Sequence, residues 1–131
     1  MIGLDTNVVL RYILQDDPAQ SAAANRLLTR LTEEDPGFIS IATTLETVWV
    51  LRSFFKFSPQ EIANVVSVLL TTESFALQNE QQVFEANYAL KRGLGEFEDA
   101  LIGALNEWAG CTETVTFDRG TARLPHFRVL R

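Results

Sequence analysis

The alternation of short apolar runs with longer helical segments most constrains what this chain can fold into. Strands are predicted at residues 2–4, 38–40, 75–77, 114–117 and 127–130. Helices are predicted at 8–14, 41–55, 81–91 and 97–108, and two more begin at Pro18 and Pro59. Strands that are joined through helices pair in parallel, because a parallel neighbour needs a long crossover. The sequence therefore predicts an α/β fold with a central, mostly parallel β-sheet flanked by helices (α/β/α).

Apolar spacing within the helices indicates which faces are buried. The apolar side of the helix that begins at Pro18 is predicted to hold Ala22, Leu27, Leu28 and Leu31. Between 41 and 55, the spacing of Ile41, Leu45, Val48, Trp49 and Leu51 suits a helix. Aromatic residues at helical spacing usually pack in a core or an interface, and we interpret Trp49, Phe54, Phe55 and Phe57 in this way.

Length and composition limit the class of protein. The 131 residues suit a single domain over 1–131, and an apolar content of 47% leaves spare apolar surface for self-association. Cys111 is the only cysteine, which excludes an intrachain disulfide and a multi-cysteine zinc site. No stretch has the pattern of a signal peptide or a membrane span, so we expect a cytoplasmic protein.

Four acidic residues stand where an α/β fold places ligand-binding groups, and each also has a simpler explanation. Asp5 and Asp118 end predicted strands, but Asp5 also suits a helix N-cap and Asp118 a turn. Asp99 begins a helix, where the helix dipole favours acids. Glu46 lies among apolar residues of a helix, where it either faces solvent or is buried at a cost.

Taken together, the four acids predict a metal site. Carboxylates that converge repel one another unless cations neutralise them, and hard oxygen ligands favour Mg²⁺ or Mn²⁺. Such a site suits phosphodiester hydrolysis, although composition alone does not select that reaction.

The ordered motifs resemble those of PIN-domain ribonucleases, and most of all VapC-type toxins. The resemblance rests on the segments LDTN at 4–7, LE at 45–46, FEDALI at 97–102 and TFDR at 116–119, and it covers nearly the whole chain. It implies that Asp5, Glu46, Asp99 and Asp118 bind Mg²⁺, or Mn²⁺ in its place, and cleave RNA. It further implies a VapB-like antitoxin protein as partner and a toxin homodimer.

The resemblance also implies supporting residues. Thr6 and Asn7 match polar positions beside the first acid, Thr116 matches one beside the last, and Glu96 matches a position that is often acidic. Glu98 departs from the pattern, because relatives commonly carry a small residue there. The apolar helices within 41–70 are the candidate surface for the partner proteins, although core packing explains many of the same residues.

The net charge of −6 argues against an ordinary RNA-binding surface, which is usually basic. Two divalent cations at the acids would bring the charge to about −2. The end of the chain also carries arginines without any acid, and we hypothesise that some contact RNA phosphates, the alternative being a solvated end. These arginines are Arg119, Arg123, Arg128 and Arg131.

Two other functions compete with the nuclease. Asp5, Thr6 and Asn7 imitate the opening motif of haloacid-dehalogenase-like phosphatases, but that family needs a second aspartate where Asn7 stands, and a late lysine. A catalytically silent PIN-like binding module is the second alternative, and the presence of all four acids argues against it.

Overall fold

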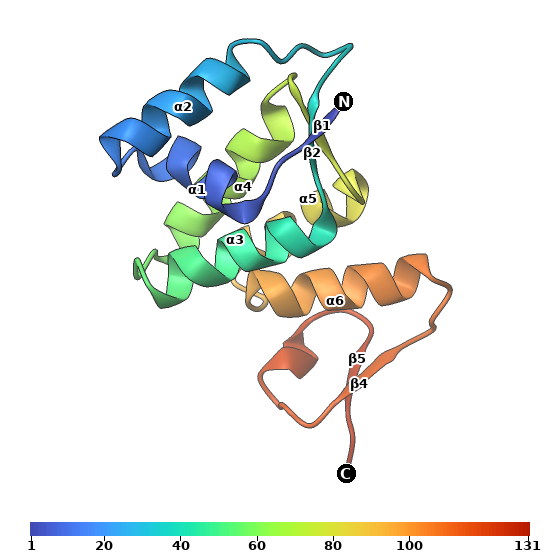
Figure 1. The fold of residues 1–131 in the computed structure, drawn as a ribbon. Coiled ribbons are helices and arrows are strands. Elements are labelled where there is room, and N and C mark those ends of the chain that lie inside the picture. Colours follow the sequence, from blue (N-terminus) through green and yellow to red (C-terminus); the bar gives the residue numbers. More distant parts are fainter. The chain divides into compact units, whose positions relative to one another are not determined.

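The computed structural model describes residues 1–131, and every strand and helix predicted from the sequence is present. The strands are β1 (Ile2–Gly3), β2 (Gly37–Ile39), β3 (Phe75–Leu77), β4 (Thr114–Thr116) and β5 (Phe127–Val129). The helices are α1 (Thr6–Leu14), α2 (Pro18–Leu28), α3 (Ile41–Ser53), α4 (Pro59–Thr71), α5 (Glu80–Lys91) and α6 (Phe97–Trp108). A short 3-10 helix, η1 (Thr121–Arg123), was not predicted. Figure 1 traces this order along the chain.

The chain forms two compact units. The first comprises Met1–Lys56 and Val68–Gln78, and the second comprises Phe57–Ser67 and Asn79–Arg131. We refer to them as the first and second units.

The first unit is built on a three-stranded parallel sheet in the order β1-β2-β3. Gly3 is paired with Phe38, and Phe38 is paired with Ala76, so the three strands end near the same edge. The core around this sheet is apolar and includes Leu4, Val9, Leu10, Ile39, Val48 and Leu51. The parallel pairing follows from the helices between the strands, since α1 and α2 join β1 to β2, and α3 and α4 join β2 to β3.

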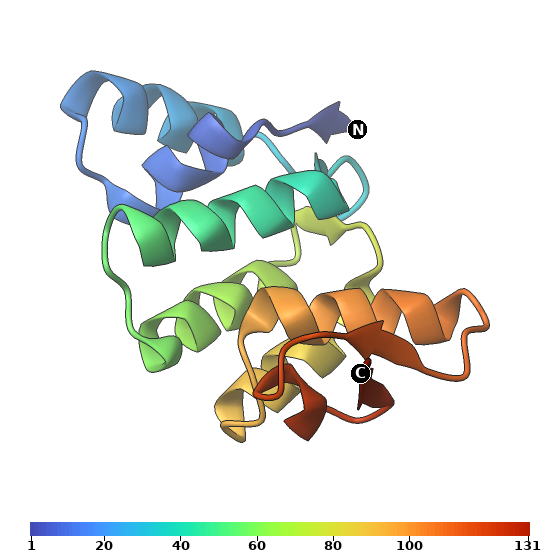
Figure 2. The ribbon, with the colours of Figure 1, turned by 90° about the horizontal axis from the view of Figure 1, so that it is seen from below.

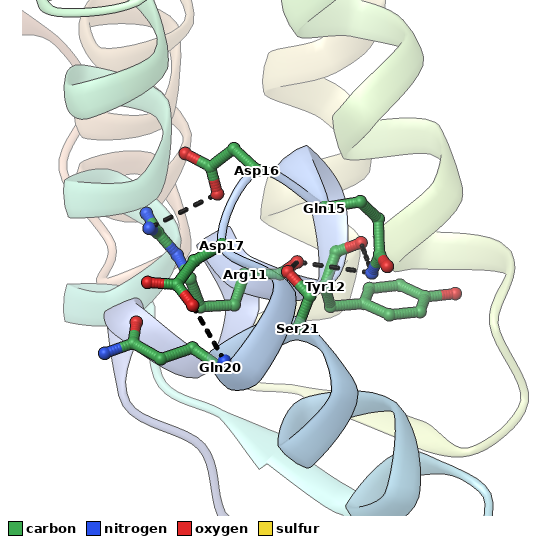
Figure 3. Close-up of polar contacts among 7 residues, drawn as sticks. All are labelled: Arg11, Tyr12, Gln15, Asp16, Asp17, Gln20 and Ser21. Atoms are coloured by element: carbon green, nitrogen blue, oxygen red, sulfur yellow. Dashed lines mark hydrogen bonds and ion pairs between the residues drawn. The ribbon is translucent and has the colours of Figure 1, made fainter.

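The turn between α1 and α2 is fixed by polar contacts, which Figure 3 shows. Asp17 caps α2 by accepting the Gln20 N–H at 2.9 Å, and Pro18 occupies the first helical position, where its missing N–H costs nothing. The Ser21 hydroxyl donates to the Arg11 carbonyl at 3.3 Å. An ion pair of 3.3 Å joins Arg11 to Asp16. These contacts hold α1 and α2 side by side.

The expectation that Ala22 lies on the buried side of α2 was wrong. Ala22 is exposed, and the buried residues of α2 are Ser21 and Ala24, because the helix turns a face of small residues toward α1. Trp49 is 48% exposed, because the buried side of α3 holds threonines and aliphatic residues instead. Leu31 is buried as predicted, although it lies beyond the end of α2.

The second unit consists mainly of α5, α6 and the C-terminal segment. Helices α5 and α6 lie side by side, as Figure 2 shows, and bury Val83, Phe97 and Leu101 almost completely. The buried amide of Asn87 on α5 donates to the Ala63 carbonyl and to the Ser67 hydroxyl, both at 3.2 Å. The first part of α4 is thereby attached to α5.

The two-stranded parallel sheet β4-β5 packs next to α6 with little space between them. A Cβ atom at Gly103 would lie only 2.4 Å from the Phe127 ring, so the absence of a side chain allows β5 to approach the helix. The α/β class and the parallel pairing predicted from the sequence are confirmed, with the strands divided between two sheets. None of the helices combines the length and apolarity needed to cross a membrane.

Candidate metal centre

Asp5 stands at the junction of β1 and α1, in the first unit. Its backbone has the extended conformation of an N-cap residue, and its carbonyl accepts the N–H groups of Val8 and Val9 at 3.0 and 3.2 Å. Its side chain makes no capping hydrogen bond, and the residue is exposed. The backbone thus starts the helix while both carboxylate oxygens stay available to a ligand.

The two residues after Asp5 have different surroundings. Thr6 is buried, whereas Asn7 is exposed and its side-chain amide has no hydrogen bond to another residue. Asn7 also lines a groove of about 360 Å³ between α1 and α2, whose walls are mostly apolar.

Glu46 lies on the exposed side of α3. Ala42 and Trp49, four residues before and three residues after it, share this exposed face, while Thr47 and Val48 are buried. The sequence left open whether Glu46 faces solvent or is buried. In the structure it faces solvent, so its carboxylate pays no desolvation cost. Since α3 begins directly after β2, Glu46 lies about 9 Å along the helix axis from Ser40.

Both acids of the first unit start from the same edge of its sheet. The Leu4 N–H donates to the Phe38 carbonyl at 2.8 Å, so the ends of β1 and β2 are adjacent. Asp5 follows the first of these strands directly, and Glu46 follows the second after one and a half helical turns. The carboxyl ends of parallel strands are the usual place for a ligand in α/β folds.

Asp99 is the third residue of α6, in the second unit, and is partly buried. Its Oδ2 atom accepts a hydrogen bond of 3.4 Å from the Thr121 hydroxyl. Thr121 is only 8% exposed and was not predicted from the sequence, because a threonine in a short irregular segment gives no periodic signal. The other carboxylate oxygen of Asp99 has no protein donor.

Asp118 follows β4 and organises the turn that leads into η1. Its Oδ1 atom accepts the Gly120 N–H at 2.8 Å, and its own N–H donates to the Thr116 hydroxyl at 3.1 Å. The turn role that the sequence offered as an alternative is therefore present, but it uses only one carboxylate oxygen. Thr121 lies three residues further on, so the short segment 118–121 contains Asp118 and also the hydroxyl that donates to Asp99.

Glu96 occupies the N-cap position of α6, and its side chain does not cap the helix. None of Asp5, Glu46, Asp99 and Asp118 forms an ion pair with a basic side chain; the ion pairs of this chain involve other acids, such as Asp16, Asp35, Glu107 and Glu113. Within each unit, no group of three or more histidine, cysteine or acidic side chains lies close enough to hold a metal ion. Each unit supplies two of the four acids.

The available oxygens suit a hard cation. The four side chains offer carboxylate oxygens only, with no cysteine or histidine among them, which is the ligand chemistry that Mg²⁺ and Mn²⁺ prefer. An uncompensated carboxylate gains from a cation more than one that is already paired with arginine. The chemistry of these four side chains therefore fits a divalent cation.

Comparison with known protein families gives a match to the PIN domain over residues 2–126. A comparison with curated proteins found no match.

Proposed function

Since the chain belongs to the PIN domain family, whose members are generally nucleases, we propose that it is a metal-dependent endoribonuclease that hydrolyses RNA phosphodiester bonds. The family match spans 2–126, which supports a single PIN domain over the whole chain. The observation that carries the proposal is the set of four acids without basic partners. No single structural role explains why all four carboxylates lack a basic partner.

We assign the main cation to Asp5 and Asp99, with Glu46 completing or supporting the site. Asp118 assists with a second ion or with the attacking water. PIN nucleases generally use divalent metal ions, and we expect Mg²⁺ here, with Mn²⁺ as a substitute. When bound, such an ion polarises the phosphate and lowers the pKa of a coordinated water.

The chain itself contributes orientation. The Thr121 hydroxyl fixes one oxygen of Asp99, and the Gly120 N–H fixes one oxygen of Asp118, so each carboxylate presents its second oxygen in a defined direction. Thr116 holds the backbone of Asp118 at the end of β4. Residues that hold ligands in this way raise metal affinity by lowering the cost of ordering them. Glu96, Thr6 and Asn7 are assigned supporting roles.

The direct test is cleavage of transfer, ribosomal and messenger RNA by wild-type protein and by Asp5→Asn and Asp99→Asn. Each substitution should lower metal-dependent cleavage more than about 100-fold, because even residues that only orient ligands contribute about 10- to 100-fold. Glu107→Gln is the matched control on α6, since Glu107 is exposed and its partner is His126, at 3.0 Å. Near wild-type cleavage by Asp99→Asn would refute the assignment.

The same assay separates the alternative functions. Cleavage that persists in chelator would exclude the metal mechanism. Turnover of phosphomonoesters without RNA cleavage would favour a haloacid-dehalogenase-like phosphatase. Absence of any turnover, with binding of a partner protein retained, would favour a catalytically silent module.

We propose further that this nuclease is the toxin of a VapBC-type pair, inhibited by a VapB-like antitoxin and assembled as a homodimer. The support is the resemblance of its motifs to VapC toxins and the apolar surface left exposed within 41–70. Trp49 and Phe54 stack edge to face with their ring centroids 5.6 Å apart, yet they are 48% and 69% exposed. Phe55 and Val68 are also exposed.

Charged substitutions test this surface. Trp49→Glu and Phe54→Glu should weaken dimerisation or antitoxin binding, measured by sedimentation and by co-purification with the antitoxin. Ala22→Glu is the control, because Ala22 is exposed on α2, outside the segment 41–70. If the two aromatic variants and the control behave alike, the placement of the interface is wrong.

A further inference from the structure

The arginines of the C-terminal segment differ in their partners. Arg128 donates through Nε and Nη2 to the Glu113 carboxylate at 3.0 and 2.8 Å. Arg123 donates to the Gly93 carbonyl at 3.0 Å. Arg119 and Arg131 are exposed and have neither an ion pair nor a side-chain hydrogen bond to another residue. Two of these arginines thus stabilise the fold, and two have charges that are free for a ligand.

The two free arginines line the same hollow. It has a volume of about 740 Å³ and is lined by Phe117, Arg119, Val129, Leu130 and Arg131. It forms because β4 and β5 are parallel, so their carboxyl ends lie together at one edge of the sheet. The Leu130 N–H donates to the Thr116 carbonyl at 2.6 Å and ties the two ends to each other.

Phe117 is the most unusual residue of this hollow. Its side chain is 79% exposed, the highest value among the large apolar residues, although it directly follows a strand. The ring pairs of the structure are Tyr12 with Phe75 and Trp49 with Phe54, so Phe117 has no aromatic neighbour. An exposed aromatic ring between cationic side chains is the usual platform for a nucleic acid base.

We propose that this hollow binds single-stranded RNA, with a base stacked on Phe117 and flanking phosphates held by Arg119 and Arg131. The inference rests on the proposed ribonuclease function. Phe117 and Arg119 are the immediate neighbours of Asp118, so the bound nucleotides lie next to the phosphate that is cleaved.

Charge supports RNA as the occupant. The chain carries a net charge of −6, which repels a polyanion from most of its surface. The segment after Asp118 contains four arginines and no acidic residue, so the free cations at 119 and 131 are not offset by acids of their own segment. A single strand fits better than a duplex, because the faces of paired bases are stacked and cannot reach the ring.

Binding is measured in an Asp99→Asn background, so that RNA stays intact, with the same concentration of Mg²⁺ for every variant. The probe is a short fluorescent single-stranded RNA, with a duplex of the same sequence for comparison. Phe117→Leu should weaken single-strand binding about 5- to 150-fold, as expected for the loss of one stacked base. Phe117→Trp, which keeps an aromatic ring, should bind the single strand as tightly as the parent protein does. Neither substitution should change the affinity for the duplex.

The arginines provide a matched comparison, because each Arg→Gln substitution removes the same charge. Arg119→Gln and Arg131→Gln should each reduce the slope of log affinity against log salt by about 0.7, the value for one phosphate contact on a single strand. Arg123→Gln and Arg128→Gln should leave the slope unchanged.

Equal effects of all four arginine variants on the salt slope would overturn the proposal, since they would indicate general electrostatic attraction and not specific phosphate contacts. Unchanged affinity in Phe117→Leu, or a parent protein that binds no RNA, would overturn it too, whether or not the wild type cleaves RNA. In contrast, the predicted pattern of binding in a protein that never cleaves RNA would support this hollow and refute the nuclease function.

Discussion

The two units supply equal numbers of candidate metal ligands but hold them differently. In the second unit, Asp99 and Asp118 accept hydrogen bonds from Thr121 and Gly120, within one short segment. In the first unit, Asp5 and Glu46 have no donor at all and depend on the strand and helix to which they belong. The second unit thus orients its two carboxylates through hydrogen bonds, whereas no hydrogen bond orients the two carboxylates of the first.

The largest effect is expected from the core of the second unit. Phe97 is 1% exposed, so Phe97→Ala should lower the free energy of unfolding by about 3–5 kcal/mol. If the chain is a single domain, this loss destabilises both units together. Trp49 reports on the first unit and Trp108 on the second, so Trp108→Phe and Trp49→Phe variants allow each unit to be followed by fluorescence.

Coincident denaturation curves of these two reporters, shifted equally by Phe97→Ala, are the expected result. Curves that separate, with only the Trp108 signal responding to Phe97→Ala, would mean that the units unfold independently and would contradict a single domain.

A smaller effect is expected from the hydrogen bond that orients Asp99. Thr121→Val keeps the shape of the side chain and removes the donor, so Mn²⁺ affinity measured by calorimetry should fall about 10- to 100-fold. Thr112→Val is the control, because Thr112 is exposed in the same unit and makes no contact with an acid of the site. Unchanged Mn²⁺ affinity in Thr121→Val would mean that the hydrogen bond to Asp99 does not help metal binding, so the two units would not differ in this respect.

The helix starts of the first unit allow a comparison within that unit. Asp17 caps α2 through its side chain, so Asp17→Ala should cost about 0.5–2 kcal/mol of unfolding free energy. Asp5 makes no such bond, and Asp5→Ala should leave stability nearly unchanged while abolishing cleavage. A loss of stability in Asp5→Ala equal to that in Asp17→Ala would favour the capping explanation for Asp5.

The smallest effect concerns the exposed pair of Glu113 and Arg128 in the second unit. The hydrogen bond from Arg128 lowers the pKa of Glu113, so the pair stabilises the folded state at neutral pH. This contribution begins to decline near the ordinary pKa of glutamate, about 4.3, and is lost as the pH falls through the lowered value. The difference in unfolding free energy between wild type and Glu113→Gln should therefore shrink toward acid pH. A difference that stays constant would show that the pair contributes nothing.

The secondary structure was largely predictable because its signals are local. The predicted bounds of the helix at 97–108 match α6, where acids open the first turn and glycine follows the end. Burial was less predictable, since Ala22 and Trp49 have apolar side chains yet face outward. Whether a helix buries an alanine or a serine depends on the partner that packs against it, which a helical period does not specify.

The candidate site was predictable as a set of residues but not as a set of contacts. The four acids are recognisable by their places at strand ends and helix starts, together with the order of the motifs. Thr121 was missed, because its bond to Asp99 joins residues 22 positions apart and belongs to an irregular segment. The contrast between free and paired arginines likewise depends on Glu113 and the Gly93 carbonyl, which no local pattern connects to them.

The close approach of Gly103 to the Phe127 ring has an evolutionary consequence. Glycine inside a helix costs about 1 kcal/mol relative to alanine, so its place in α6 is kept by the ring that covers it. Among homologous chains, residues at these two positions should therefore covary: alanine or serine at 103 should accompany a smaller side chain at 127. A lineage that changed one position alone would have to move the last strand away from its helix, together with Arg131, which follows that strand.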